Sequence, residues 1–271
     1  MSALLKGTRG KIGVIILVGF FVMLIAASFL IPYSPYSTNF RPNSPPSLSH
    51  LLGTDSQGHD VLSQLVWGAY PSLFVAVLAS FGAMLLGFLT GTLAGYYPKA
   101  EALFSGISDV VITFPALALL VLIGMLYPDL GYVLIFALIL VLWPPISRAI
   151  RSQVLSVRTR QYVDAAKVSG MSNPAIIYRI IIPETVSIGF AFFLTQTIVA
   201  ILITVSLEFL GVGNPTIVSW GSIFYWAQQT AFSYGDWWWV IGPGILIAVF
   251  VFSLTLIGFS VEEAMHPRLR S

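Results

Sequence analysis

Long apolar runs without charge are the feature that most limits how this chain can fold. Only 9% of its 271 residues are charged and 57% are hydrophobic, whereas soluble domains give about a quarter of their residues to charge. About 20 apolar helical residues cross a bilayer core of roughly 30 Å. The sequence therefore predicts an all-α polytopic membrane protein with six transmembrane helices. The six runs are 12–31, a stretch within 61–98, 107–127, 130–147, 185–210 and 237–261.

The first run follows a basic segment, which is also the order found in a secretory signal. A signal core has about 7–15 apolar residues, so the longer run 12–31 favours an uncleaved anchor. Proline is favoured in the first turn of a helix, so we expect the second span to start at Pro71. This divides the chain into a cytoplasmic amino terminus (1–11), a first span (12–31), an outer segment (32–70) and a core (71–271) with the other spans and a cytoplasmic loop (148–184).

The distribution of Lys and Arg predicts which side of the membrane each segment occupies. Basic residues are retained on the cytoplasmic face. With six spans, 12 of the 13 Lys and Arg residues lie on the side of the two termini, and only Arg41 lies on the other. Both termini are therefore predicted to be cytoplasmic. The twelve are Lys6, Arg9, Lys11, Lys99, Arg148, Arg151, Arg158, Arg160, Lys167, Arg179, Arg268 and Arg270.

Several classes of chemistry are disfavoured by what the sequence lacks. It has no cysteine, so disulfides are excluded, and no Gly-x-x-x-x-Gly-Lys-Ser/Thr loop to cradle phosphates. No catalytic residue is predicted, because the histidines lie outside the spans. A metal site at His50 and His59 is the less favoured interpretation, because two loop imidazoles without further ligands are usually surface residues. No basic recognition fold indicates nucleic acid binding, and the nearly charge-free mid-span regions disfavour an ion-coupled secondary transporter.

The loop 148–184 has a pattern of its own. Its apolar spacing predicts a helix over 148–169, which Gly170 ends in a left-handed conformation. Asn173 then caps a second helix that begins at Pro174 and stops at Pro183. From charge alone, this loop is equally well explained as a solvated basic surface.

The order of residues in this loop resembles a known signature. Asp164-Ala165-Ala166, Gly170, Ile180 and Ile182-Pro183 resemble the EAA signature of permeases in binding-protein-dependent ABC importers, with Asp in place of Glu and Ile in place of Leu.

Other segments resemble the peptide and nickel branch of these permeases, from about residue 52 to 270, and its shorter "C" type. Gly53, Asp55, Gly58 and Asp60 belong to an outer motif of that branch, in which Arg usually stands at the place of His59. Singly, each of these glycines is explained by a turn. The other matching segments are Asp109 with Phe114-Pro115, 209–213, 219–221 and 267–270.

The resemblance implies the type I ABC importer permease fold and a function. Such a chain forms half of the pathway of an ATP-driven importer in a prokaryotic inner or plasma membrane. Its implied partners are a homologous second permease, two cytoplasmic ATPases that bind ATP and Mg, an extracytoplasmic solute-binding protein and membrane lipid, so no cofactor is expected in this chain. Short peptides are the favoured solutes, and oligosaccharides and nickel are the alternatives.

The resemblance also assigns candidate site residues. Asp164, Ala165, Ala166, Gly170, Ile180 and Pro183 are predicted to couple the chain to an ATPase, with small alanines seated in its groove. Glu208, Gly211 and Trp220 are candidates for the pathway or an outer gate. The branch usually has its acidic residue at the place of Thr204, about 6 Å away along the same helical face. For Glu208, a packing contact or a partner-chain salt bridge is the alternative. For Trp220 and its aromatic neighbours, the alternative is a place in an interfacial aromatic belt.

Overall fold

The computed structural model describes residues 7–31, 33–127 and 131–265. Within these ranges the chain is almost entirely helical. Its only β pairing there is an isolated bridge between Thr54 and Asp60. The elements are α1 (Thr8–Leu30), α2 (Val61–Tyr96), α3 (Pro98–Thr113), α4 (Ala116–Leu126), α5 (Gly131–Arg158), α6 (Gln161–Val168), α7 (Asn173–Ile176), the π-helix η1 (Ile177–Ile181), α8 (Ile182–Phe209), α9 (Trp220–Tyr234) and α10 (Trp237–Met265).

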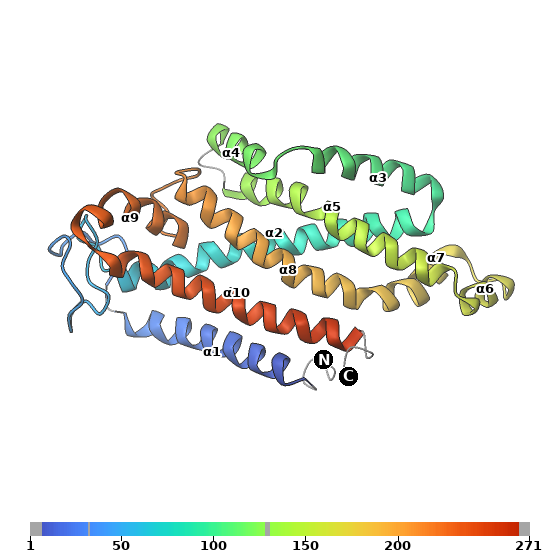
Figure 1. Cartoon of the computed structure of the whole chain (residues 1–271), viewed down its shortest axis with the longest axis horizontal. Coiled ribbons are helices and arrows are strands. Elements are labelled where there is room, and N and C mark those ends of the chain that lie inside the picture. Colours follow the sequence, from blue (N-terminus) through green and yellow to red (C-terminus); the bar gives the residue numbers. More distant parts are fainter. Residues whose placement is uncertain (1–6, 32, 128–130, 266–271) are drawn as a thin grey trace.

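The long helices α1, α2, α5, α8 and α10 run side by side along the long axis of the molecule (Figure 1). Within the described residues, five helices are long and apolar enough to cross a membrane, and there are six spans if the bent pair α3 and α4 counts as one. The amino-terminal end of α1 and the carboxyl-terminal end of α10 lie at the same end of the bundle as α6 and α7 (Figure 1). The segment 33–60 and α9 lie at the opposite end, which we call the α9 end.

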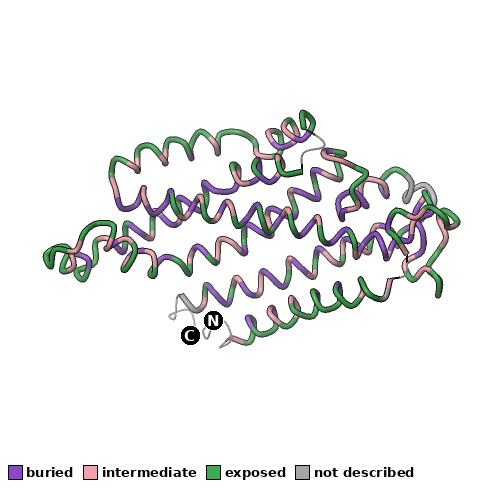
Figure 2. The backbone as a smooth tube through the Cα atoms, turned by 180° about the vertical axis from the view of Figure 1, so that it is seen from behind, coloured by how far each residue is buried: buried purple, intermediate pink, exposed green. Residues whose placement is uncertain are grey.

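Helix α2 occupies the centre of the bundle, where Figure 2 shows most of the buried residues. It packs closely on α5 through glycines four residues apart. A Cβ atom at Gly87 would lie 2.7 Å from Ile146 Cβ, one at Gly91 2.5 Å from Ser147 O, and one at Gly95 2.6 Å from Val154 Cβ. Without an aqueous driving force, membrane helices associate through such close backbone packing. The glycine positions therefore fix α2 against α5.

Two proline predictions were wrong, because a bundle of membrane helices tolerates proline inside its helices. Pro71 does not begin a helix, since α2 starts ten residues earlier, where the Asp60 side chain accepts from the backbone N–H of Ser63. The fourth span was predicted to end at residue 147, but α5 continues past Pro144 and Pro145 to Arg158. Pro183 does not stop a helix either. It lies in the first turn of α8, directly after η1. Local π-type turns are one way in which membrane helices accommodate proline.

Three further expectations about helix boundaries differ from the structure. Asn173 does not cap the helix at Pro174 but is itself the first residue of α7, whose N-cap is Ser172. The predicted helix 148–169 is two helices, because Arg160 is extended (φ −80°, ψ 144°) between α5 and α6. The third span, 107–127, is bent by 79° between α3 and α4. Phe114 is extended there, as expected for a residue that precedes proline.

Candidate functional site

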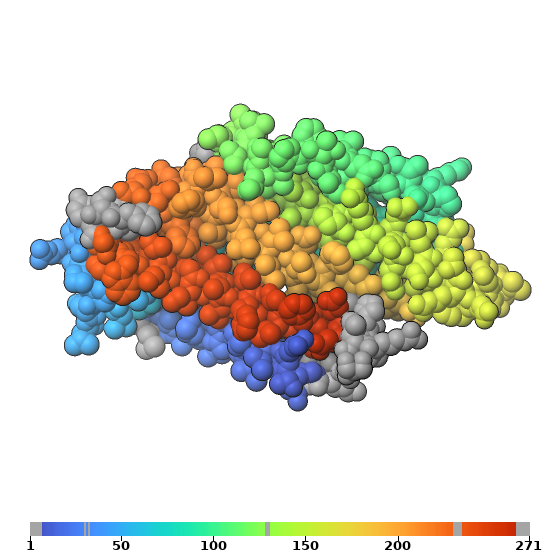
Figure 3. Space-filling model, in the orientation of Figure 1, coloured from blue at the N-terminus to red at the C-terminus, as the bar shows by residue number. Residues whose placement is uncertain are grey.

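Helix α6 protrudes from the end of the bundle and is the most isolated helix in the described structure (Figures 1 and 3). Val163 alone is fully buried and anchors α6 to the core. Val168 is 90% exposed, and the exposed Asp164 carboxylate accepts from Lys167 Nζ at 2.9 Å. Asp164 therefore already has a partner on its own helix, and a basic residue of another protein would compete with Lys167.

The turn after α6 has the geometry that its glycine predicts. Gly170 has a φ of +81°, a left-handed conformation that costs other residues roughly 1–2 kcal/mol. Its backbone N–H donates to Lys167 O at 3.0 Å, and that of Met171 donates to Ala166 O at 3.0 Å. These bonds satisfy carbonyl groups that a helix end leaves free. The chain can therefore reverse and enter α7.

The predicted coupling residues do not form one surface. Asp164 and Ala165 are exposed on α6, and Ala166 is half-buried against the core. Ile180 and Pro183 lie beyond α7, where η1 continues into α8. Only the α6 residues and Gly170 thus belong to the protruding unit.

At the α9 end, the predicted outer motif forms a compact turn before α2. Gly53 (φ +69°) and Gly58 (φ +83°) are both left-handed. Asp55 Oδ1 accepts from the backbone N–H groups of Gln57 and His59, both at 2.8 Å. Asp55 Oδ2 accepts from Gln64 Nε2 at 3.0 Å and lies 2.6 Å from His59 Nδ1. The turn therefore satisfies a buried carboxylate before the helix begins.

The two histidines considered for metal binding are held by different carboxylates. His59 pairs with Asp55, and His50 Nδ1 lies 2.9 Å from Asp60 Oδ1. Within the described ranges, no group of three or more His, Cys, Asp or Glu side chains is placed to hold a metal ion. His266 and the motif 267–270 lie outside the described residues.

Glu208 lies near the last residue of α8 and is bonded within the chain. Its Oε2 accepts from Ser219 Oγ at 2.7 Å, and the backbone N–H of Gly221 also donates to this carboxylate. A side chain at Gly221 would collide with Glu208. Gly211 is left-handed (φ +78°) and lies between these groups in the sequence. The carboxylate therefore ties the start of α9 to the end of α8.

Trp220 is fully buried at this junction. Its Nε1 donates to Leu65 O at 3.0 Å, and its backbone N–H donates to Ser72 Oγ at 3.0 Å. Both acceptors belong to α2, so the ring fixes α9 to the central helix. In this conformation it presents no surface to a solute.

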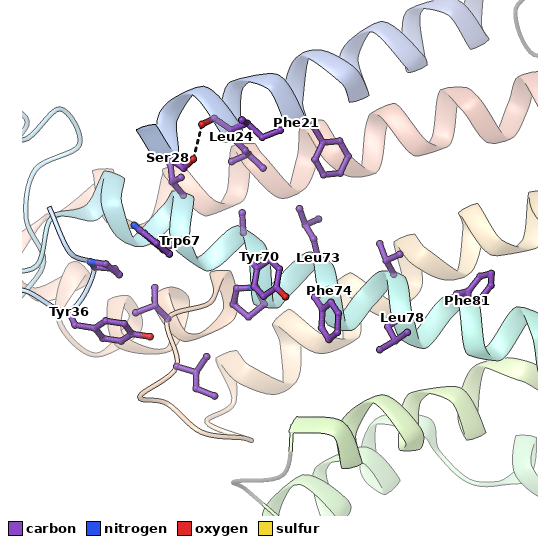
Figure 4. A pocket seen from close by; sticks show the side chains of 18 residues that line it. Phe21, Leu24, Ser28, Tyr36, Trp67, Tyr70, Leu73, Phe74, Leu78 and Phe81 are labelled. Atoms are coloured by element: carbon purple, nitrogen blue, oxygen red, sulfur yellow. Dashed lines mark hydrogen bonds between the residues drawn. The ribbon is translucent and has the colours of Figure 1, made fainter. Parts of the chain in front are cut away.

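Sequence reasoning missed an apolar groove between α1 and α2. Its volume is about 980 Å³. Figure 4 shows Phe21 of α1 on one side and Trp67, Tyr70 and Phe74 of α2 on the other. The spacing of the α2 aromatics by three and four residues is a signal of one helical face, although membrane helices are apolar on every face and the pattern is easily lost.

Asp109 also has a partner within the chain. Its Oδ1 accepts from Arg148 Nη2 at 2.5 Å. A second ion pair between the same helices joins Glu101 to Arg151. Both pairs hold α3 against α5.

The helical bundle, with a helix that protrudes from one end and a turn at Gly170, defines a polytopic membrane protein. Residues 83–271 match the family of binding-protein-dependent transport system inner membrane components. The chain belongs to this family, and it is a multi-pass membrane permease component of an ABC importer.

Curated relatives extend the similarity over nearly the whole chain. The dipeptide transport system permease protein DppC of Alkalihalophilus pseudofirmus is 33% identical over 98% of this chain and 88% of its own length. DppC of Bacillus subtilis is 32% identical over 98% and 83%, respectively. The oligopeptide transport system permease protein OppC of Bacillus subtilis is 27% identical over 96% and 85%.

Proposed function

We propose that this chain is the C-type permease of an ATP-driven importer of short peptides. It forms half of the pathway, beside a homologous second permease, and receives its solute from an extracytoplasmic binding protein. ATP and Mg bind to two cytoplasmic ATPases. The similarity to relatives named for dipeptide and oligopeptide transport, over almost the full length of the chain, supports the peptide assignment.

The observation that carries this function is the exposed helix α6 followed by a left-handed turn. A stiff element that protrudes from a membrane bundle can seat in a groove of a soluble subunit and transmit its movement. We place the ATPase contact on α6, with Asp164 and Ala165 at the surface and Ala166 supporting them. Ile180 and Pro183 act where the movement enters α8.

The orientation that this function requires can be tested directly, because the chain has no native cysteine. We place the α6 end in the cytoplasm. Single cysteines at the exposed positions Gln161 and Asn39 would be treated in intact cells with a membrane-impermeant maleimide. Asn39→Cys should react and Gln161→Cys should react only after the cells are opened. The reverse pattern would overturn the proposed orientation.

Substitutions at Gly170 test the coupling role with a control at the same site. Proline fixes φ near −65° and cannot adopt the observed +81°, whereas asparagine enters the left-handed region more readily than other side chains. Gly170→Pro should abolish solute uptake while membrane insertion continues, and Gly170→Asn should retain most uptake. Normal uptake by Gly170→Pro would remove the coupling role.

The solute is best identified on the partner binding protein, since in the proposed function the binding protein, and not the permease, selects the solute. A labelled dipeptide bound to that protein would be displaced by unlabelled peptides and not by oligosaccharides or nickel. If only an oligosaccharide or only nickel displaces the label, that compound replaces peptides as the proposed solute class.

We place the outer gate at the α9 end, at Glu208, Gly211 and Trp220. The bonds from Ser219 and Gly221 to Glu208 support a role in holding this end closed. Glu208→Gln should alter uptake or assembly, and a variant normal in both would exclude it.

A further inference from the structure

Tyr96, the last residue of α2, contacts both ends of the segment that carries α6. It is 5% exposed. Its hydroxyl donates to Asn173 Oδ1 at 2.8 Å, and Asn173 is the first residue of α7. The Arg158 guanidinium carbon lies 5.8 Å from the centre of the Tyr96 ring, which is within cation–π range. Arg158 is the last residue of α5.

These two contacts join three helices at one side chain. The protruding segment leaves the bundle after Arg158 and returns at Asn173, so Tyr96 bridges its departure and return. The chain already links α6 to α5 and to α7, but Arg160 is extended and Gly170 is left-handed at those links. Two non-helical links would allow α6 to tilt without moving the rest of the bundle, whereas α7 continues through η1 into α8.

The glycine next to Tyr96 lies where α2 and α5 pack closely, so Tyr96 is attached to a stiff pair of helices. At Gly95, a Cβ atom would lie 2.6 Å from Val154 Cβ and 2.9 Å from Arg151 O. Such contacts leave no room for α2 to shift independently of α5. A force applied to Asn173 through the Tyr96 hydroxyl therefore acts on α2 and α5 together.

We infer that Tyr96 is a positioning residue for coupling, which makes the return of the chain at Asn173 move with α2 and α5 when α6 is displaced. This inference rests on the proposed function, because it supposes that an ATPase displaces α6. With the bond intact, the displacement reaches three membrane helices, α2, α5 and α8. Without it, the displacement bends the turn at Gly170 and part of the ATP is hydrolysed without transport.

The test uses the complete importer in proteoliposomes, with radiolabelled dialanine as the solute. The quantity measured is the ratio of ATP hydrolysed to dialanine imported. Tyr96→Phe removes only the hydroxyl, and Asn173→Ala removes its acceptor. A hydrogen bond contributes about a two- to tenfold change in an equilibrium, so both variants should raise the ratio by about that factor. The double variant should be no worse than either single one, because both delete one interaction.

Two control variants separate positioning from general destabilisation. Asn173→Asp keeps an oxygen acceptor and should keep the wild-type ratio. Tyr97→Phe changes the adjacent tyrosine, whose ring lies 5.0 Å from that of Tyr96 and whose hydroxyl makes no hydrogen bond in the described structure, and it should also keep the ratio. A merely structural role would lower the amount of assembled importer in the membrane and leave the ratio unchanged.

The outcomes distinguish this inference from the function on which it rests. If wild-type importer takes up dialanine with ATP and Tyr96→Phe has the same ratio, Tyr96 has no positioning role and the proposed function stands. A raised ratio in Asn173→Asp as well would also overturn the inference. If the wild-type importer does not import dialanine, the proposed peptide function fails and the inference falls with it.

Discussion

The close approach of α2 and α5 predicts that a single methyl group at Gly91 destabilises the chain. A Cβ atom there would lie 2.5 Å from Ser147 O and 2.9 Å from Ile150 Cβ. Ordinary contacts of a Cβ atom begin at 3.4 Å, so the gap to the Ser147 oxygen must widen by 0.9 Å (3.4 minus 2.5). That oxygen belongs to the backbone and cannot rotate away. The two helices must therefore separate.

The size of the effect follows from two opposing contributions. Overpacking in a well-packed interior costs about 1–3 kcal/mol, and replacing glycine by alanine inside a helix returns about 1 kcal/mol. Because a backbone atom is in the way, we expect the upper part of the first range and a net loss of about 1–2 kcal/mol. For a chain of this size, this lowers the midpoint of thermal unfolding by about 2–8 °C.

The measurement is thermal unfolding of the purified chain in detergent, followed by intrinsic tryptophan fluorescence. Gly258→Ala is the matched control, since Gly258 lies inside α10 and a Cβ atom there would meet nothing within 4 Å. This control should be neutral or stabilising. Equal midpoints for Gly91→Ala and Gly258→Ala would refute the close packing of α2 on α5.

Three further variants test other contacts. Asp60→Ala should cost about 1 kcal/mol in a thermal unfolding assay, because Ser63 N–H loses its capping acceptor, and Asp60→Asn should lose less; equal losses would exclude capping as the reason. Gly221→Ala should reduce the amount of folded chain recovered from membranes, because its side chain would collide with Glu208, and normal recovery would show that the junction of α8 and α9 is loose. Arg148→Gln should change the free energy of unfolding, measured by thermal unfolding in detergent, by less than about 1 kcal/mol, because the Arg148 and Asp109 side chains are 51% and 67% exposed. A larger loss would show that the pair is a main support of α3.

Much of the fold was readable from the sequence, since apolar length alone marks a membrane span. Each of the six predicted runs corresponds to one of the five long helices or to the bent pair α3 and α4. Helix ends were read less well, because proline was taken as a boundary. In the bundle, Pro71, Pro144 and Pro183 all lie within helices. Helix α9 was not predicted, because its 15 residues fall short of the roughly 20 apolar residues by which the spans were recognised.

The candidate site was likewise predictable only in part from the sequence. The left-handed turn at Gly170 was predictable, because a glycine at the end of a helical pattern needs no tertiary information. The partners of Glu208 and Asp109 were not predictable in this way. Glu208 is bonded to Ser219, 11 residues away in the sequence, and Asp109 to Arg148, 39 residues away. The role of Trp220 depended equally on its burial against α2, which no local pattern encodes.

The sequence by itself determined that this chain is a bundle of membrane helices with a polar loop that carries a glycine turn, because hydrophobic length and left-handed backbone preferences are local properties. Only the tertiary structure decided that α6 protrudes, that α2 and α5 pack as one stiff unit, and that Tyr96 ties them to Asn173. Such contacts depend on which faces of distant helices meet. In a membrane chain, nearly every face is apolar, so the hydrophobic pattern that identifies the spans does not specify how they pack.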